Sequence, residues 1–128
     1  MKRLFAVLLS IFLVLSLAGC NRISINHRGN ATLNYCGKVR GNDIELTQAL
    51  TAEETGSVKK YLSSARYCHD GAGCPFDENI SIAFGDQIFA IATDDCPTVW
   101  VVGSDDYYTI SEAGRSYIVS LFQKYVAS

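Results

Sequence analysis

The cysteines beyond residue 30 carry the most reactive side chains of this sequence. Cys36, Cys68, Cys74 and Cys96 could form two disulfides, or they could bind zinc together with His69. Zinc sites usually contain cysteines separated by about two residues, whereas the closest pair here, Cys68 and Cys74, is separated by five. The spacing therefore favours disulfides, and we expect neither a bound metal nor a cofactor.

His69 and the acidic loops are the candidates for catalysis. Asp70 follows His69, but adjacent side chains rarely face each other, and no Gly-x-Ser-x-Gly nucleophile motif accompanies them. The acidic residues Asp94 and Asp95 could bind calcium, although their spacing does not match an EF-hand loop. Solvated loops are the simpler interpretation. We expect no enzyme activity and keep a small metal-dependent hydrolase, using His69 and these loops, as an alternative.

Trp100, Asp105, Asp106, Tyr107 and Tyr108 form the best candidate for a binding surface. Tyrosine and tryptophan are enriched at protein interfaces, because a rigid ring covers a large area at a small entropy cost. Neighbouring residues of a strand point to opposite faces, so at least one of the two tyrosines must face away from the core. We therefore predict that a partner binds this rim of aromatic and acidic side chains.

The beginning of the chain has the layout of an export signal. Lys2 and Arg3 precede an apolar run over residues 4–18, which is short for a membrane span. The run leads into Leu-Ala-Gly-Cys at residues 17–20, which resembles the lipobox of bacterial lipoproteins. The resemblance covers the leader alone. It implies that a signal peptidase removes residues 1–19 and that Cys20 carries the lipid, palmitate among its acyl chains, that anchors an extracytoplasmic domain to a membrane of the cell envelope.

The chain after the leader divides into a tether and one domain. Residues 20–30 hold the lipidated cysteine and a polar tether, and residues 31–128 are enough for a single domain. The net charge of −2 and the lack of any nucleic-acid-binding motif argue against a nucleic acid partner. Because thiols usually oxidise outside the cytoplasm, export implies two disulfides.

A predicted hairpin favours one of the three possible pairings of the four cysteines. Two apolar segments flank a Gly-Asp loop at residues 85–86, of the kind that fixes strand register. Extending that register brings Pro75 opposite Cys96, so we predict a disulfide between Cys74 and Cys96. The remaining pair is then Cys36 and Cys68.

Two helices are predicted from caps and periodicity. Thr51 and Glu54 match a capping box at the start of the first helix, which should end near Arg66. Ser111 should cap the second helix, with Glu112 in its first turn. In each helix apolar residues recur at i, i+3, i+4 and i+7, so each helix should bury one stripe.

Strands are predicted over residues 79–84, 87–93, 98–102 and 107–110, preceded by a hairpin with its turn at Gly41-Asn42. Short turns between these segments indicate an antiparallel meander. Helices with one apolar stripe and a sheet with one apolar face predict a small two-layer α+β domain, with both helices packed on one face and two disulfides.

These features favour an envelope lipoprotein whose domain binds a protein partner without catalysis, as an inhibitor, an immunity protein or an accessory subunit does. The small, rigid, lipid-anchored form is the basis of this interpretation. Two alternatives stay open: the extracytoplasmic metal-dependent hydrolase or metal-binding protein, and a structural envelope lipoprotein.

Overall fold

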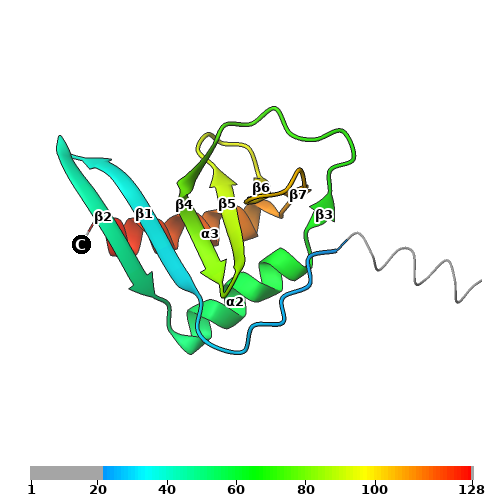
Figure 1. Ribbon diagram of the computed structural model, residues 1–128, viewed down its shortest axis with the longest axis horizontal. Helices are drawn as coiled ribbons and strands as arrows, with labels where there is room; N and C mark the ends of the chain where they lie inside the picture. The colour runs from blue at the N-terminus through cyan, green and yellow to red at the C-terminus, as the bar shows by residue number, and fades with distance from the viewer. Residues whose placement is uncertain (1–21, 128) are drawn as a thin grey trace, which may run out of the picture.

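The computed structural model describes residues 22–127 (Figure 1). The predicted signal peptide, residues 1–19, and Cys20 lie outside the described residues. The described chain forms two helices and seven strands, in the order β1 (Thr32–Val39), β2 (Asn42–Ala49), α2 (Ala52–Ser63), β3 (Arg66–Tyr67), β4 (Phe76–Phe84), β5 (Gln87–Ala92), β6 (Thr98–Val101), β7 (Tyr107–Thr109) and α3 (Glu112–Val126).

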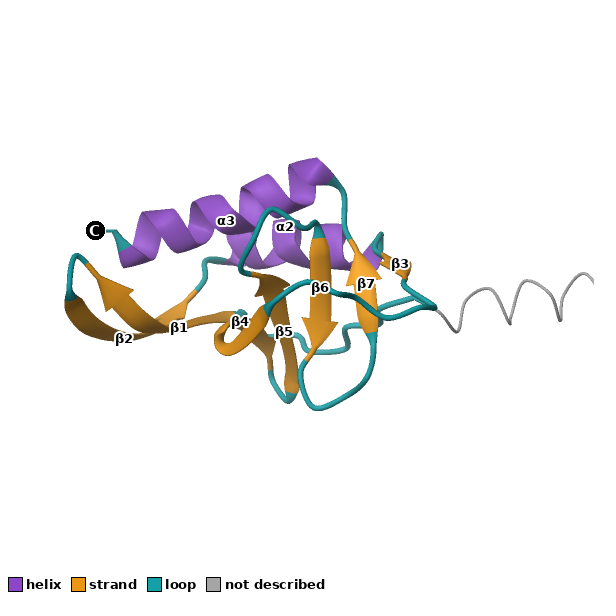
Figure 2. Cartoon of the chain, turned by 90° about the horizontal axis from the view of Figure 1, so that it is seen from above, coloured by secondary structure: helices purple, strands orange, loops and turns teal. Residues whose placement is uncertain are grey.

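The strands form one antiparallel sheet in the order β2-β1-β4-β5-β6-β7-β3. The predicted meander corresponds to β4, β5, β6 and β7, and the β1–β2 hairpin joins it by pairing β1 with β4. Both helices lie on the same side of the sheet (Figure 2). The α+β class is therefore confirmed, and the sheet has one face covered by helices, the inner face, and one open face.

The helix caps lie where the sequence predicts them. The Thr51 hydroxyl accepts a hydrogen bond from the Glu54 N–H (3.1 Å), and the Glu54 carboxylate accepts one from the Thr51 N–H (3.0 Å). Ser111 caps α3 through its hydroxyl alone, which accepts a hydrogen bond from the Gly114 N–H (3.1 Å). The helix α2 ends at Ser63, three residues before the predicted end, because Arg66 already pairs with Thr109 as the first residue of β3.

The β1–β2 turn differs from the prediction by one residue. Val39 pairs with Asn42, so the two loop residues are Arg40 and Gly41 rather than Gly41 and Asn42. Both have positive φ, 54° and 82°. A two-residue hairpin loop needs this conformation to match the twist of its strands, and here an arginine adopts it beside the glycine.

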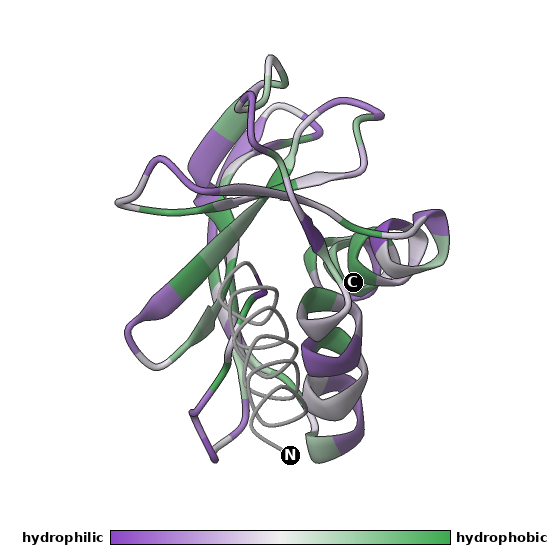
Figure 3. Ribbon diagram, turned by 90° about the vertical axis from the view of Figure 1, so that its right-hand side faces the viewer, coloured by the Kyte–Doolittle hydropathy of each residue, from purple (hydrophilic) through white to green (hydrophobic). Residues whose placement is uncertain are grey.

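The core lies between the inner face of the sheet and the two helices. Leu33, Ile82 and Val99 from three strands are almost completely buried, together with Val58 from α2 and Ile118 from α3. Figure 3 shows the two layers from the side, with the strands at the left and the helices at the right. Burial of this single apolar layer is the main driving force for the fold.

The segment that we expected to be a free polar tether instead lies along the domain. Ile23 is 7% exposed and belongs to the core. The Lys59 ammonium donates to the His27 carbonyl (2.9 Å), and the Gln87 amide donates to the Ser24 carbonyl (2.8 Å). The alternation of isoleucines with polar residues in this segment therefore reflects packing against the domain, and the chain is held from Ile23 onward.

Candidate functional site

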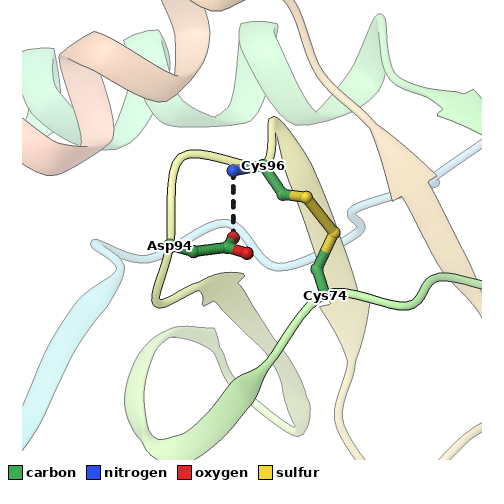
Figure 4. Close-up of side chains that lie close together, drawn as sticks. All are labelled: Cys74, Asp94 and Cys96. Atoms are coloured by element: carbon green, nitrogen blue, oxygen red, sulfur yellow. Dashed lines mark hydrogen bonds between the residues drawn. A yellow bond between two sulfur atoms is a disulfide. The ribbon is translucent and has the colours of Figure 1, made fainter.

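One disulfide joins Cys74 to Cys96, as predicted (Figure 4). However, the register between β4 and β5 differs from the predicted one. Phe76 and Ser81 are five positions apart on β4, whereas their partners Ala92 and Ala90 are two positions apart on β5, so β4 contains a bulge. The ladder therefore shifts. Pro75 accepts a hydrogen bond from Thr93 instead of facing Cys96, and the loop after Thr93 brings Cys96 back to Cys74.

The predicted second disulfide is wrong, because Cys36 and Cys68 are free thiols. Cys36 lies in β1, next to one edge strand, and Cys68 follows β3, which is the other edge strand. Five strand spacings, roughly 24 Å, separate these strands, whereas a disulfide needs Cα atoms within about 7 Å. The Cys68 thiol instead forms a hydrogen bond with the Thr109 hydroxyl (3.1 Å). Local strand patterns did not indicate that α2 connects β2, at one edge of the sheet, to β3, at the opposite edge.

The acidic loop after β5 has a structural role. The Asp94 carboxylate accepts a hydrogen bond from the Cys96 N–H (3.0 Å), which closes the turn (Figure 4). Arg115 of α3 donates to the Asp94 carbonyl (2.6 Å) and lies 4.0 Å from the Asp95 carboxylate. These contacts join the loop to the helix layer, and the Asp94 side chain has a local role in closing the turn.

Asp94 and Cys96 of this loop, together with Cys74 before β4, are the one group of three potential metal ligands within residues 22–127. Its two sulfur atoms are bonded to each other, and a metal needs the thiolate form. His69 does not join this group; its exposed ring stands edge-on to Tyr67, with 5.0 Å between centroids. Within residues 22–127, the structure therefore does not bring His69 into one group of potential metal ligands with Asp94.

An aromatic cluster of Phe76, Trp100 and Tyr107 lies on the open face of the sheet. Trp100 and Tyr107 are directly paired on β6 and β7, and their rings stack with 6.5 Å between centroids and 18° between planes. Phe76, at the start of β4, lies 5.5 Å from the Tyr107 ring and 6.2 Å from the Trp100 ring. All three side chains are half-buried. The β4 bulge places Phe76 here, and no local pattern in the sequence indicates this position.

Hydrogen bonds in the β6–β7 turn fix the tryptophan. The Trp100 indole N–H donates to the Ser104 carbonyl (2.8 Å), and the Ser104 hydroxyl donates to the Val101 carbonyl (2.7 Å). The same hydroxyl accepts from the Asp106 N–H (3.0 Å). Because the indole N–H is bonded within the turn, the ring offers its apolar surface, and little side-chain entropy remains to be lost when a partner binds.

The other predicted rim residues divide between the two faces. Tyr108 is 8% exposed and belongs to the core, so it is removed from the candidate surface. Asp105 is exposed at the turn, whereas the Asp106 carboxylate accepts a hydrogen bond from the Tyr67 hydroxyl (3.3 Å). Partial burial, followed by the charge of Asp106, raises the pKa of Tyr67. Strand alternation predicted that at least one of the two tyrosines would face away from the core, but not which one.

A groove of about 340 Å³ opens on the same face, between the β1–β2 hairpin and the β4 bulge. Its wall is polar and includes two carboxylates, Glu45 from β2 and Glu78 from the bulge. Val102, two residues after Trp100 in the chain, lines it as well, whereas the three rings of the aromatic cluster do not. The groove exists because β1 pairs with β4, a non-local contact that no local sequence pattern indicated.

No known protein family, characterised protein or solved structure matches this chain. Within residues 22–127, no helix has the length and apolar character needed to cross a membrane.

Proposed function

We propose that this protein is a lipid-anchored envelope protein whose domain binds a protein partner through the open face of its sheet, without catalysis. The aromatic cluster of Phe76, Trp100 and Tyr107 is the observation that carries the proposal. Roles as an inhibitor, an immunity protein or an accessory subunit are all consistent with this form of binding.

The physical argument starts from what the open face leaves uncovered. Aromatic side chains bury much area on binding, and they dominate the centres of protein interfaces. Here three rings stand together on a face over which no described helix packs (Figure 2). Exposed Asp105 lies in the turn that joins the two strands of Trp100 and Tyr107, and Glu45 and Glu78 add carboxylates to the same face of the sheet. An apolar centre with an acidic rim is the arrangement expected for a partner with a basic rim around an apolar patch.

The anchor is the second part of the proposal. We infer from the lipobox at residues 17–20 that Cys20 is acylated, and residue 22 enters the domain at the end that holds β3, while the β1–β2 turn lies at the far end (Figure 1). A lipid on Cys20 then keeps the β3 end near the membrane. The hairpin and its groove then lie at the end farther from the lipid, and the aromatic cluster on β6 and β7 lies closer to the β3 end.

Mass spectrometry of the protein isolated from its own host tests the anchor. The expected species lacks residues 1–19 and carries acyl chains on Cys20, and a Cys20→Ser variant loses the acyl mass. A native species that retains residues 1–19, or that has no acyl mass, would overturn this part of the proposal.

Chemical cross-linking in the native host, followed by purification, tests the binding surface. The Trp100→Ala/Tyr107→Ala variant should lose at least about tenfold of the cross-linked partner, because it removes the apolar centre. A matched control is Tyr61→Ala/Tyr117→Ala, which removes two half-buried rings of the helix layer that lie 5.7 Å apart. Equal losses in the two variants, or no loss in the first, would contradict the proposal.

A further inference from the structure

The strand β2 forms a long open edge of the sheet. It is the last strand in the sheet order, and its hydrogen-bonded neighbour is β1. β2 runs for eight residues without a proline or a break in register, whereas β3, the opposite edge strand, has two residues. Edge strands of this length present a row of unpaired N–H and C=O groups, onto which another strand can add.

The register shows which backbone groups face outward. Leu50 N–H donates to the Ala31 carbonyl (2.8 Å), and the pairing continues unbroken from there to Val39 and Asn42. In an antiparallel pair every second residue bonds to the neighbouring strand, so the residues between them turn their backbone groups away. The outward-facing residues of β2 are therefore Asp43, Glu45, Thr47 and Ala49.

The side chains beside this edge differ between the two faces of the sheet. Asp43, Glu45 and Thr47 are exposed on the open face, and Glu78 lies across the groove from Glu45. Within residues 22–127 neither Asp43 nor Glu45 forms an ion pair, although Lys38 of β1 stands opposite Asp43. On the inner face, half-buried apolar side chains, Ile44 and Leu46, border the same edge. A strand added here therefore meets acidic groups on one face and apolar groups on the other.

We propose that β2 binds an extended segment of a protein partner whose residues alternate between basic and apolar side chains. The backbone of that segment pairs with the outward groups of Asp43, Glu45 and Thr47. Its lysine or arginine side chains lie beside Asp43 and Glu45, and its apolar side chains extend the layer of Ile44 and Leu46. This inference rests on the proposed function in one respect, that the partner is a protein.

A second copy of this chain is a poorer occupant of the edge. Each copy brings its own Asp43 and Glu45 to the same face of the joined strands, and like charges across a strand pair are destabilising. A basic strand meets the same two carboxylates with opposite charge.

Titration of the full-length protein in detergent micelles with capped eight-residue peptides tests the proposal. The probe alternates lysine with valine, and the comparison peptide alternates glutamate with valine. We expect the lysine peptide to bind at least about tenfold more tightly at low salt. A peptide N-methylated at its lysine residues, whose backbone N–H groups face β2 in this pairing, cannot complete the backbone ladder, and it should lose most of this binding. Equal binding of the methylated peptide would show charge attraction without strand addition and would overturn the proposal.

Two variants locate the binding on β2. Thr47→Pro removes one outward-facing N–H but no hydrogen bond to β1, so the fold should remain while binding of the lysine peptide falls at least about fivefold. Asp43→Lys/Glu45→Lys should reverse the preference toward the glutamate peptide. The matched control, Asp70→Lys/Asp86→Lys, makes the same charge change in two exposed turns and should keep the original preference. A control that reverses the preference equally would contradict a site on β2.

Circular dichroism of each variant separates lost binding from lost folding. If Thr47→Pro unfolds, the methylated peptide and the charge reversal still decide the question. Sedimentation that shows a dimer of the unmodified protein, dissociated by Thr47→Pro, would make a second copy the occupant and overturn the proposal. Failure of the peptides to bind, with cross-linking to a partner still dependent on Trp100 and Tyr107, would reject the edge site and leave the proposed function standing.

Discussion

The two faces of the sheet differ in the side chains they carry and in what covers them. On the inner face Leu33, Ile82 and Val99 pack against both helices with almost no exposed surface. On the open face the neighbouring strand positions carry Asn34, Ser81 and Trp100, in a mixture of polar and aromatic side chains. Apolar burial accounts for the composition of the inner face. It does not require an aromatic cluster on the open face, and that difference is why we assign binding to the open face.

Truncation of one inner residue should have the largest effect on stability. Leu33 is fully buried, so Leu33→Ala should lower the free energy of unfolding by about 3 to 4 kcal/mol through lost burial and a cavity. The next residue, Asn34, faces the groove, and Asn34→Ala should change it by about 0.5 kcal/mol or less. Urea unfolding measures both. Similar losses at the two positions would contradict the division between the faces.

Loss of the disulfide should come next and should affect the open face. Cys74 lies two residues before Phe76 of the aromatic cluster. Its disulfide partner, Cys96, follows 22 residues later in the chain. Cys74→Ser/Cys96→Ser should cost about 3 kcal/mol by the chain-entropy argument. The start of β4 should also loosen, and the fluorescence of Trp100, the single tryptophan, should report the change. Unchanged fluorescence with the stability loss would show that the bond does not position the cluster.

Acid should weaken the helix layer through Glu54. This buried carboxylate accepts hydrogen bonds from the Tyr125 hydroxyl (2.6 Å) and the Lys124 ammonium (3.0 Å), and thereby joins the start of α2 to the end of α3. Burial alone would raise its pKa, but the hydrogen bonds from the Thr51 N–H, Tyr125 and Lys124 outweigh it and lower the pKa to about 2.

Because the folded pKa of Glu54 is below the unfolded value, its contribution is complete above about pH 5 and is lost as the pH falls toward 2. The loss should be roughly 2 to 3 kcal/mol. In Glu54→Gln the unfolding free energy should depend less on pH over this range, and the exposed neighbour provides the control in Glu53→Gln. An identical pH profile for the two variants would contradict the role of Glu54.

A smaller effect on stability is expected from the aromatic cluster of the open face. Tyr107→Ala removes stacked contacts with Trp100 and Phe76 and should cost about 1 kcal/mol. Tyr108→Ala, one position along, removes a core ring and should cost about 3 kcal/mol. Thermal unfolding of the two variants measures the contrast. A larger loss for Tyr107 would mean that the cluster serves stability more than binding.

Local patterns in the sequence predicted most of the elements, because capping boxes, apolar stripes and two-residue loops act over a few residues. Thr51 and Ser111 begin their helices as expected, and the loop at Gly85 and Asp86 sets the register of β4 and β5 at that end. The β4 bulge and the pairing of β1 with β4 could not be predicted in this way, since both depend on contacts between distant segments.

The same difference between local patterns and long-range contacts determines which residues of the candidate site could be predicted. Trp100 and Tyr107 were predicted from residue type and alternation, whereas Phe76 and the groove appear only when the sheet is assembled. The rejected pairing of Cys36 with Cys68 has the same origin. Counting cysteines gave an even number, but the crossover through α2 places these two near opposite edges of the sheet.

Site-specific photocross-linking in the native host tests the central claim most directly. A photoreactive residue at Asp105 samples the open face, and one at Ser116 of α3 samples the helix layer; both positions are exposed. We predict a protein adduct at Asp105 that disappears in the Trp100→Ala/Tyr107→Ala background, and none at Ser116. An adduct at Ser116 alone, or one at Asp105 that persists without the two rings, would contradict the account.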